Sequence, residues 1–389
     1  MDPEFLPYGR QTIDDDDIAA VVAALRAPQL TQGPLVARFE AALAAHIGAP
    51  FVSVCATGTA ALHLVYAALG LGAGDEIITS PITFSATASA AYQVGASVRF
   101  ADVEPDTGNL DVASVEALIT GRTRALVAVH LGGLPADLAP LRRLADRHGL
   151  WLIEDAAHAL GATYLGAHVG AAWSDAATFS FHPVKHLTTA EGGAVAVHDP
   201  ELKRRIDTLR HHAIERASER LESPSPGPWY YEIQGQGFNY RLSDVQCALG
   251  LSQLAKQPAA VARRRAIAAT YRRAIAERFG GRVTPQPERA GRESSYHLFP
   301  VAIDFAGLGT SRTAVVEHLR ARGVGTQVHY IPLTVQPHHR RRGGPSGARP
   351  GVDHYYQRTL SLPMYPALDD ADLARVVDAL AASLVEVST

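Results

Sequence analysis

The strongest constraint on the fold is an alternation of short apolar runs with longer helical segments between residues 51 and 197. The short runs are rich in β-branched residues, and the longer segments between several of them are rich in alanine and leucine. This order predicts an α/β fold in which helices cover a largely parallel sheet. The candidate strands are Phe51–Cys55, Glu76–Thr79, Ser97–Ala101, Ala125–His130, Trp151–Glu154, Ala177–Phe181 and Ala194–Val197.

Helical periodicity extends before, within and after this region. The expected helices are Asp14–Leu25, Leu35–His46, Ala60–Leu69, Leu138–His148 and Pro200–His212. A longer helix is predicted from Ser243 to Arg278, and Gln257-Pro258 should kink it or divide it in two. The proline therefore suggests a boundary between a large domain, residues 6–255, and a small domain, residues 256–389.

The C-terminal part is predicted to form a smaller α+β unit. It has candidate strands at Leu298–Ile303 and Thr326–His329 and candidate helices at Thr313–Arg322 and Ala371–Val385. Two stretches are expected to be loops: Ser223–Gly237, which begins with a run of prolines, and His338–Pro350, which is basic and predicted to be the least structured.

Composition narrows the possible classes of protein. With 36 basic and 39 acidic residues the net charge is −3, so no overall field favours nucleic acid. No run of about 18 apolar residues is present, which argues against a membrane-spanning chain. Cys55 and Cys247 are too few for a disulfide framework and predict buried thiols in a reducing, cytoplasmic setting. Residues 1–5 resemble a cloning remnant, so the natural chain is expected to begin near Leu6.

Lys185 is the first candidate for chemistry. It follows a predicted strand and precedes two glycines, in Phe179-Ser-Phe-His-Pro-Val-Lys185 and Glu191-Gly-Gly193. A lysine at the carboxyl edge of a parallel sheet points toward the cleft where such sheets bind ligands. Partial desolvation would lower the pKa of its amine and suit it to Schiff-base chemistry. The competing interpretation is a surface lysine with no chemical task.

A carboxylate and an imidazole follow the preceding strand, at Asp155 and His158. Both should open onto the same sheet edge as Lys185. A carboxylate beside a heterocyclic nitrogen keeps that nitrogen protonated, which a pyridoxal phosphate ring needs to accept electrons. The alternatives are a helix N-cap for Asp155 and a packed core histidine for His158.

A phosphate site is indicated by Cys55-Ala-Thr-Gly-Thr-Ala-Ala-Leu62, a turn of small residues that leads into a helix. The candidate phosphate ligands are Thr57, Gly58, Thr59 and Ala60, with Ser180 closing the cup. The ring of Phe84 is placed to lie on a cofactor, although a buried core phenylalanine is the alternative.

These residues together resemble the DegT/DnrJ/StrS family of pyridoxal-phosphate-dependent sugar aminotransferases, over nearly the whole chain. The motifs that carry the resemblance are Leu30–Gly33, Thr57–Leu62, Ser80–Ala88, Glu154–Gly161, Phe179–Lys185, Glu191–Gly193 and Gly237–Asp244. The resemblance implies an aspartate-aminotransferase-like fold (fold type I), with a mostly parallel seven-stranded sheet and a smaller C-terminal α+β domain. The implied cofactor alternates between pyridoxal 5′-phosphate (PLP) and pyridoxamine 5′-phosphate.

The resemblance also implies a role for each matched residue. Lys185 would bind PLP as a Schiff base, Asp155 would pair with the pyridine nitrogen, and Phe84 and His158 would lie at the ring. Thr57, Gly58, Thr59 and Ser180 would hold the phosphate. In the family the asparagine that matches Asn239 reaches the cofactor of the neighbouring subunit, so a homodimer with shared active sites is implied.

Three segments point to one branch of the family: Leu30–Gly33, Thr188–Gly193 and Gln327–Pro332. That branch transfers an amino group from L-glutamate to C4 of a UDP-linked 4-keto-6-deoxy-N-acetylhexosamine, on a pseudaminic-acid-type pathway. The resemblance makes His329, Tyr330 and Thr31 candidate contacts of the nucleotide sugar. A proline-rich insertion at Leu221–Tyr231 departs from the family pattern and puts the exact sugar in doubt.

Other activities remain as alternatives. The chain could aminate another keto sugar, linked to dTDP or GDP, or a cyclitol. A PLP-dependent deoxysugar dehydratase would have histidine in place of Lys185, and a non-catalytic sensor would have lost the lysine or gained a DNA-binding segment. Metal binding is not expected, because the adjacent pairs His211-His212 and His338-His339 have no carboxylate or cysteine at ligand spacing.

Overall fold

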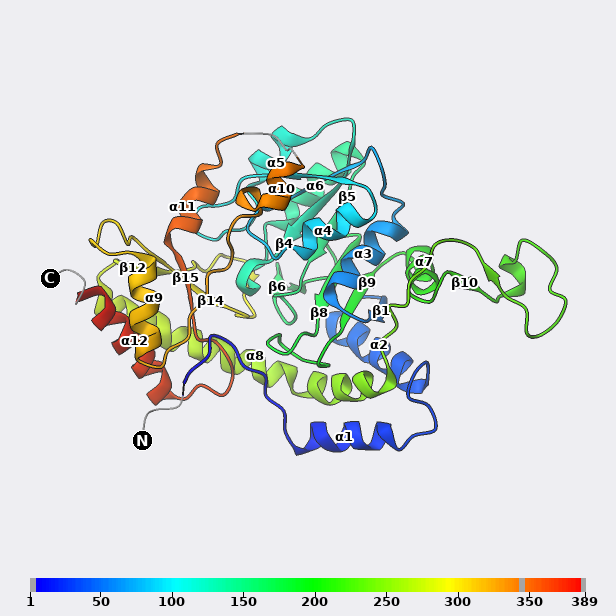
Figure 1. Cartoon of the computed structure of the whole chain (residues 1–389), viewed down its shortest axis with the longest axis horizontal. Coiled ribbons are helices and arrows are strands. Elements are labelled where there is room, and N and C mark those ends of the chain that lie inside the picture. The colour runs from blue at the N-terminus through cyan, green and yellow to red at the C-terminus, as the bar shows by residue number, and fades with distance from the viewer. Residues whose placement is uncertain (1–4, 343–346, 386–389) are drawn as a thin grey trace.

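The computed structural model describes residues 5–342 and 347–385, and Figure 1 shows the whole arrangement. At its centre is a seven-stranded sheet in the order β1-β9-β8-β5-β4-β2-β3. Its strands are β1 (Phe51–Cys55), β2 (Glu76–Thr79), β3 (Ser97–Phe100), β4 (Thr123–Val129), β5 (Trp151–Asp155), β8 (Ala176–Ser180) and β9 (Gly193–Val197). Only β9 runs antiparallel to its neighbours within this sheet, so the predicted α/β fold with a mostly parallel sheet is confirmed.

The sheet is buried on both faces, which explains why its strands are almost continuously apolar. On β4, Ala125 and Val127 pack on one side, whereas Leu126 and Ala128 pack on the other. One face is covered by α3 (Gly58–Ala68), α4 (Ala86–Gln93) and α7 (Pro200–Arg210). The other face is covered by α2 (Pro34–Ile47), α5 (Val112–Leu118), α6 (Leu138–His148) and part of α8 (Asp244–Phe279).

The helix α8 is continuous through Pro258, so the prediction that it divides in two there is wrong. A proline removes one backbone donor from the helix, but neighbours on both halves hold α8 together. Its first half packs on α1 (Asp15–Leu25) and α2, and its second half packs on α12 (Asp370–Val385). Gln257, beside the proline, is buried and donates a hydrogen bond to the carbonyl of Leu160. The domain boundary at residues 255 and 256 falls inside this helix and stays a prediction.

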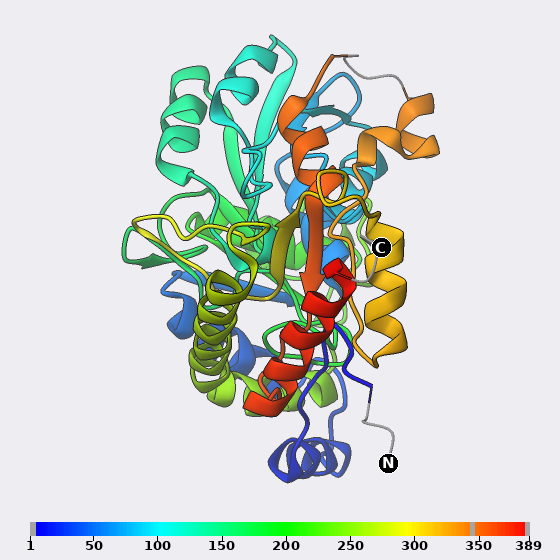
Figure 2. The ribbon, with the colours of Figure 1, turned by 90° about the vertical axis from the view of Figure 1, so that its left-hand side faces the viewer.

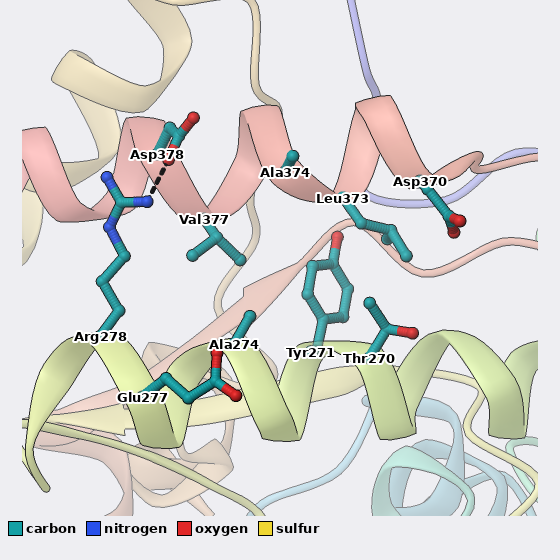
Figure 3. Close-up of a pocket in the computed structure, with 10 residues that line it drawn as sticks. All are labelled: Thr270, Tyr271, Ala274, Glu277, Arg278, Asp370, Leu373, Ala374, Val377 and Asp378. Carbon is teal, nitrogen blue, oxygen red and sulfur yellow. Dashed lines mark ion pairs between the residues drawn. The ribbon is translucent and has the colours of Figure 1, made fainter.

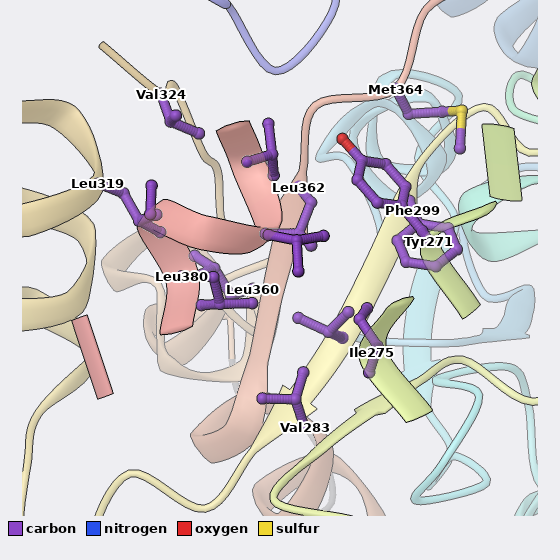
Figure 4. Packing of buried hydrophobic residues seen from close by; sticks show 14 of the residues in the cluster. Tyr271, Ile275, Val283, Phe299, Leu319, Val324, Leu360, Leu362, Met364 and Leu380 are labelled. Carbon is purple, nitrogen blue, oxygen red and sulfur yellow. The ribbon is translucent and has the colours of Figure 1, made fainter. Parts of the chain in front are cut away.

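The second half of α8 belongs to a separate core. There a three-stranded sheet, β12 (Val283–Pro285), β14 (Phe299–Ile303) and β15 (Thr359–Leu362), packs with α9 (Arg312–Ala321) and α12. Figure 2 shows these helices beside the small sheet, and Figure 4 shows the packing, in which Tyr271 lies on Phe299 with ring centroids 4.9 Å apart. The predicted α+β unit is therefore confirmed.

Two C-terminal expectations need correction. Residues 326–329 do not form a strand, since only Gln327 pairs, through one bridge to Ser361. The stretch expected to be unstructured contains most of α10 (Pro337–Arg341) and leads into α11 (Pro350–Arg358). Residues 343–346 of that stretch, and residues 1–4 of the expected cloning remnant, lie outside the described residues.

The predicted loop at 223–237 lies in an arm that projects from the body (Figure 1). The arm is tied at its base by β10 (Ile214–Glu215) and β11 (Glu232–Ile233), a short pairing that the sequence did not predict. The insertion lies in this arm, and Trp229 is 70% exposed there.

The short elements that complete the fold are β6 (Thr163–Tyr164), β7 (Ala167–His168), β13 (Arg292–Glu293), η1 (Leu131–Gly133), η2 (Ser218–Arg220) and η3 (Leu333–Val335). Both cysteines are buried free thiols, as predicted, and burial raises the pKa of each to about 12. Among the described residues, no helix has the length and apolar character needed to cross a bilayer.

Close packing of α2 on α8 predicts a large effect of one methyl group. A Cβ at Gly250 of α8 would lie 2.5 Å from the ring of Phe39, which is fully buried on α2. We expect Gly250→Ala to lower the free energy of unfolding by about 1–3 kcal/mol through overpacking, despite the helix propensity of alanine. Denaturant unfolding measures the change. Gly121→Ala is the matched control, since no atom lies within 4 Å of its added Cβ, and equal stability of both variants would contradict the prediction.

Candidate active site

The predicted site residues gather where the parallel strands end. Asp155 is the last residue of β5 and Ser180 the last of β8, and Thr57 follows β1. The antiparallel β9 begins at this edge, where Gly193 pairs with both Cys55 and Ser180. Parallel strands bring their carboxyl ends to one edge, so side chains distant in sequence meet there.

Lys185 lies in a turn after β8, where its amide donates to the carbonyl of His182. Its side chain is partly buried, and its Nζ lies 3.4 Å from Nε2 of His297. Burial lowers the pKa of Lys185 to about 8, against the opposing attraction of Asp155. The partial burial and the contact with His297 argue against an ordinary surface lysine, and the lowered pKa leaves more of the amine neutral than in an exposed lysine.

The buried carboxylate of Asp155 is fixed by hydrogen bonds on both oxygens. Oδ2 accepts a 2.6 Å hydrogen bond from the hydroxyl of Thr87, and Oδ1 accepts a weaker one from the amide of Ala157. Thr83 in turn contacts Thr87, with the two hydroxyls 2.8 Å apart. No helix begins after Asp155, because residues 156–161 form turns, so the N-cap alternative is wrong. Thr87 was missed as a site residue, although it lies within the motif Ser80–Ala88.

His158 is buried and bonded at both nitrogens. The amide of Gly132 donates to Nδ1 over 3.4 Å, and Nε2 lies 3.1 Å from the hydroxyl of Tyr330. Burial, with a contribution from nearby Lys185, holds the pKa of His158 well below its ordinary value, so the ring is neutral. A neutral imidazole with a proton on Nε2 satisfies both contacts.

The residues predicted to hold a phosphate lie around the start of α3. The hydroxyl of Thr57 caps this helix by accepting from the amide of Ala60, so the amide of Ala60 is already engaged, contrary to the expectation that it binds phosphate. The amides of Gly58 and Thr59 open the helix, where no carbonyl of the same helix can pair with them. A Cβ at Gly58 would lie 2.8 Å from Cβ of Ser180, so the glycine allows β8 to approach closely.

Phe84 is 62% exposed, so it is not a core residue, and its ring lies 6.4 Å from that of Tyr330. Tyr330 contacts His158, as described above. His329 instead faces the small sheet, with Nδ1 2.9 Å from the hydroxyl of Ser361, and burial lowers its pKa to about 3. The ring centroids of His329 and Tyr330 lie 4.9 Å apart, but the two side chains have different hydrogen-bond partners.

Thr31 and Asn239 have no described contact with the residues around Lys185. Thr31 is exposed and pairs through its backbone with Ser243, beside the start of α8. Asn239 is exposed and pairs with His211 near the base of the arm. Among the described contacts of the chain, none joins either residue to Lys185 or Asp155.

The residue that sequence reasoning missed altogether is His297, which precedes β14. It is buried, its ring centroid lies 4.4 Å from that of His158, and it contacts Lys185 although 112 positions separate the two. No local pattern marks a histidine before a strand as part of a distant site. Only the packing of the C-terminal part against the sheet edge reveals it.

A cavity of about 430 Å³ lies elsewhere, between α8 and α12 (Figure 3). Arg278 and Asp378 form an ion pair across it, and the residues that line it include none of the site residues above. The chemistry of the sheet edge, not this cavity, identifies the candidate active site.

Comparison with known proteins agrees with this geometry. Residues 11–381 match the DegT/DnrJ/EryC1/StrS aminotransferase family. The spore coat polysaccharide biosynthesis protein SpsC of Bacillus subtilis is 39% identical over 378 residues, which cover 97% of this chain and 96% of that protein. The chain therefore belongs to the DegT/DnrJ/EryC1/StrS aminotransferase family.

Solved structures are similar over the whole fold. PseC of Helicobacter pylori, an aminotransferase involved in the biosynthesis of pseudaminic acid, has a TM-score of 0.91 and 31% identity, covering 98% of this chain and 100% of that one. Spr1654 of Streptococcus pneumoniae in its PLP form has a TM-score of 0.90 and 27% identity, covering 98% and 99%. Aminotransferases of this family depend on PLP, and these neighbours confirm the predicted fold class.

The pKa of Lys185 predicts selective labelling. The chain has three lysines, Lys185, Lys203 and Lys256. We expect acetic anhydride to acetylate Lys185 in cofactor-free protein with a half-maximal rate near pH 8, because its pKa is lowered to about 8. Lys256 is the internal control: burial lowers its pKa, but hydrogen bonds to Asp14 and Asp17 outweigh burial and raise it, so its labelling should require higher pH. The labelling is measured by mass spectrometry of the peptides. The same pH dependence of acetylation at Lys185 and Lys256 would contradict the prediction.

Proposed function

We propose that this chain is a PLP-dependent sugar-nucleotide aminotransferase that takes its amino group from L-glutamate. The acceptor we propose is C4 of a UDP-linked 4-keto-6-deoxy-N-acetylhexosamine, which makes the product UDP-4-amino-4,6-dideoxy-N-acetyl-β-L-altrosamine. The observation that carries the proposal is the meeting of Lys185, Asp155 and the Gly58–Ser180 cup at one sheet edge. The similarity to PseC supports the pseudaminic-acid-type substrate.

The residues at this edge fit PLP. A Cβ at Gly193 would lie 2.5 Å from the carbonyl of Thr57, and one at Gly58 would meet Ser180, so two glycines let β8, β9 and the start of α3 pack closely around the proposed phosphate site. Lys185 supplies an amine of lowered pKa, and Asp155 supplies a buried carboxylate. These are the donor and acceptor types that the aldehyde, the phosphate and the pyridine nitrogen of PLP require.

Bound PLP would supply an electron sink for negative charge that develops beside its imine nitrogen. Asp155 holds a proton on the pyridine nitrogen, and Thr87 fixes the carboxylate in place for that task. Lys185 would bind PLP through Nζ, and its free amine would carry a proton between the reacting carbon of the substrate and that of the cofactor. His158 and Phe84 confine the ring. Gly58, Thr59, Thr57 and Ser180 bind the phosphate.

We assign Tyr330 to the orientation of His158 as well as to the substrate pocket, because its hydroxyl contacts the imidazole. Thr31 and His329 stay candidate substrate contacts. Glutamate leaves as 2-oxoglutarate in the first half-reaction, and the keto sugar accepts the amino group in the second. The two buried thiols are consistent with the cytoplasm as the site of action.

We further propose a homodimer in which each subunit completes the other's site through Asn239. Asn239 is exposed, and none of the described contacts joins it to Lys185 of its own chain, which leaves its side chain free for a contact to the partner's cofactor. The helix α1 also leaves Ile18, Val22 and Leu25 exposed at helical spacing, an apolar stripe that self-association would bury.

The absorption spectrum tests the cofactor and the amino donor together. We expect purified wild type to show a PLP band that L-glutamate converts to the pyridoxamine form, and Lys185→Ala to lack the lysine-linked band. Lys256→Ala is the control and should behave as wild type, because Lys256 pairs with Asp14 and Asp17 away from the site. If L-glutamate did not change the wild-type band, the proposed reaction with glutamate would be refuted. If it does change the band, a panel of UDP-, dTDP- and GDP-linked keto sugars then identifies the acceptor.

Mixing two inactive variants tests the shared site. Lys185→Ala and Asn239→Ala should each be nearly inactive as homodimers. After subunit exchange, a mixed dimer has one site with both native residues, so a 1:1 mixture should recover about a quarter of wild-type activity. Absence of recovery, with exchange verified by mass spectrometry, would show that Asn239 acts within its own chain or not at all.

A further inference from the structure

Three imidazoles surround the amine of Lys185. His158 follows β5, His186 is the next residue in the chain, and His297 comes from the segment before β14. The ring centroid of His297 lies 4.4 Å from that of His158 and 5.6 Å from that of His186. Burial holds the pKa of all three well below the ordinary value, with Lys185 contributing to each. All three are therefore neutral near pH 7.

Two of these imidazoles already have partners other than Lys185. Nδ1 of His158 accepts from the amide of Gly132, and its Nε2 pairs with Tyr330. Nε2 of His186 donates to the carbonyl of Ser295 over 3.1 Å. These hydrogen bonds go to backbone groups and to a tyrosine, and neither imidazole has a described hydrogen bond to the lysine.

His297 differs from them in its hydrogen bonds. Its Nε2 faces Nζ of Lys185 at 3.4 Å, and its Nδ1 is buried with no hydrogen-bond partner among the described residues. The charged and titratable groups that face it are Lys185, His158, His186 and Arg264. With no acidic group among them, the ring stays neutral and can present a lone pair to the amine.

The surrounding backbone holds His297 in this position. The amide of Ser295 donates to Gly133 over 3.2 Å, and the amide of Leu298 donates to Gly132 over 3.1 Å, so the segment is fixed on both sides of the histidine. From α8, the buried Arg264 donates to the carbonyl of Tyr296. A base held this rigidly acts without reorganisation.

We propose that His297 is the base that exchanges a proton with Nζ of Lys185, an inference that rests on the proposed function. When Nζ bonds to the aldehyde carbon of PLP, the aldehyde oxygen leaves as water, so two protons leave Nζ and end in that water. The lone pair on Nε2 accepts the first of them: one N–H bond breaks at lysine, one forms at imidazole, and the imidazole then gives the proton to the departing oxygen. The second proton follows the same route, so two N–H bonds and the C–O double bond break while the C–N double bond and two O–H bonds form. No oxidant or further reactant is needed.

The test is the rate at which cofactor-free protein captures PLP, followed by absorbance in wild type and His297→Gln. Glutamine keeps a polar group of similar reach but exchanges no proton. We expect capture about 100-fold slower in the variant, with partial recovery on adding imidazole. His198→Gln is the matched control, because His198 is exposed beyond β9, and it should capture PLP as wild type does.

A second readout separates chemistry from structure. The acetylation profile of Lys185 should be the same in wild type and His297→Gln, because burial and Asp155 set the pKa of that amine. Should the variant not fold, slower capture by wild type in D2O than in H2O carries the test instead. Equal capture by the folded variant and wild type, or no D2O effect, would overturn the role of His297. Failure of wild type to bind PLP at Lys185 would instead overturn the proposed function.

Discussion

The desolvated amine of Lys185 beside the carboxylate of Asp155 is the interaction on which the rest of the site depends. Removing an ammonium group from water costs free energy, and one carboxylate offsets only part of it, so the pKa of the lysine falls to about 8. The other groups around the amine are neutral imidazoles, which carry no negative charge that would stabilise the ammonium form. A larger fraction of the amine is thus neutral near pH 8 than in an ordinary lysine.

This arrangement requires two distant parts of the chain to lie in close contact. Gly133, after β4, has a φ of +99°, and a Cβ there would lie 2.9 Å from the carbonyl of His158, the hydroxyl of Ser295 and the amide of Tyr296. Only glycine permits this approach, which seats His297 against Lys185. The C-terminal part of the chain therefore contributes a residue, His297, to the candidate site.

Some motif residues have structural roles, and a sequence motif does not distinguish these from catalytic or ligand-binding roles. Asp244 ends the motif Gly237–Asp244, yet its buried carboxylate accepts hydrogen bonds from the amides of Gly33 and Leu35 at the start of α2. Ala60 lies in the phosphate motif, but its amide pairs with Thr57. The role of a motif residue depends on which groups lie against it in the folded structure, and the sequence alone does not reveal those groups.

The sequence by itself determined the α/β class and the seven strands, and it predicted Lys185 and Asp155 as site candidates, because strand periodicity and the position at the end of a strand are local properties. It was wrong about a division of α8 at Pro258, where packing holds the helix together, and about residues 326–329, which pair through a single residue; it also missed Thr87 and His297. Tertiary structure alone decided those, since hydrogen bonds and burial between segments many residues apart leave no local pattern. The lowered pKa of Lys185 was also decided by the tertiary structure, because desolvation depends on all the groups packed around the amine.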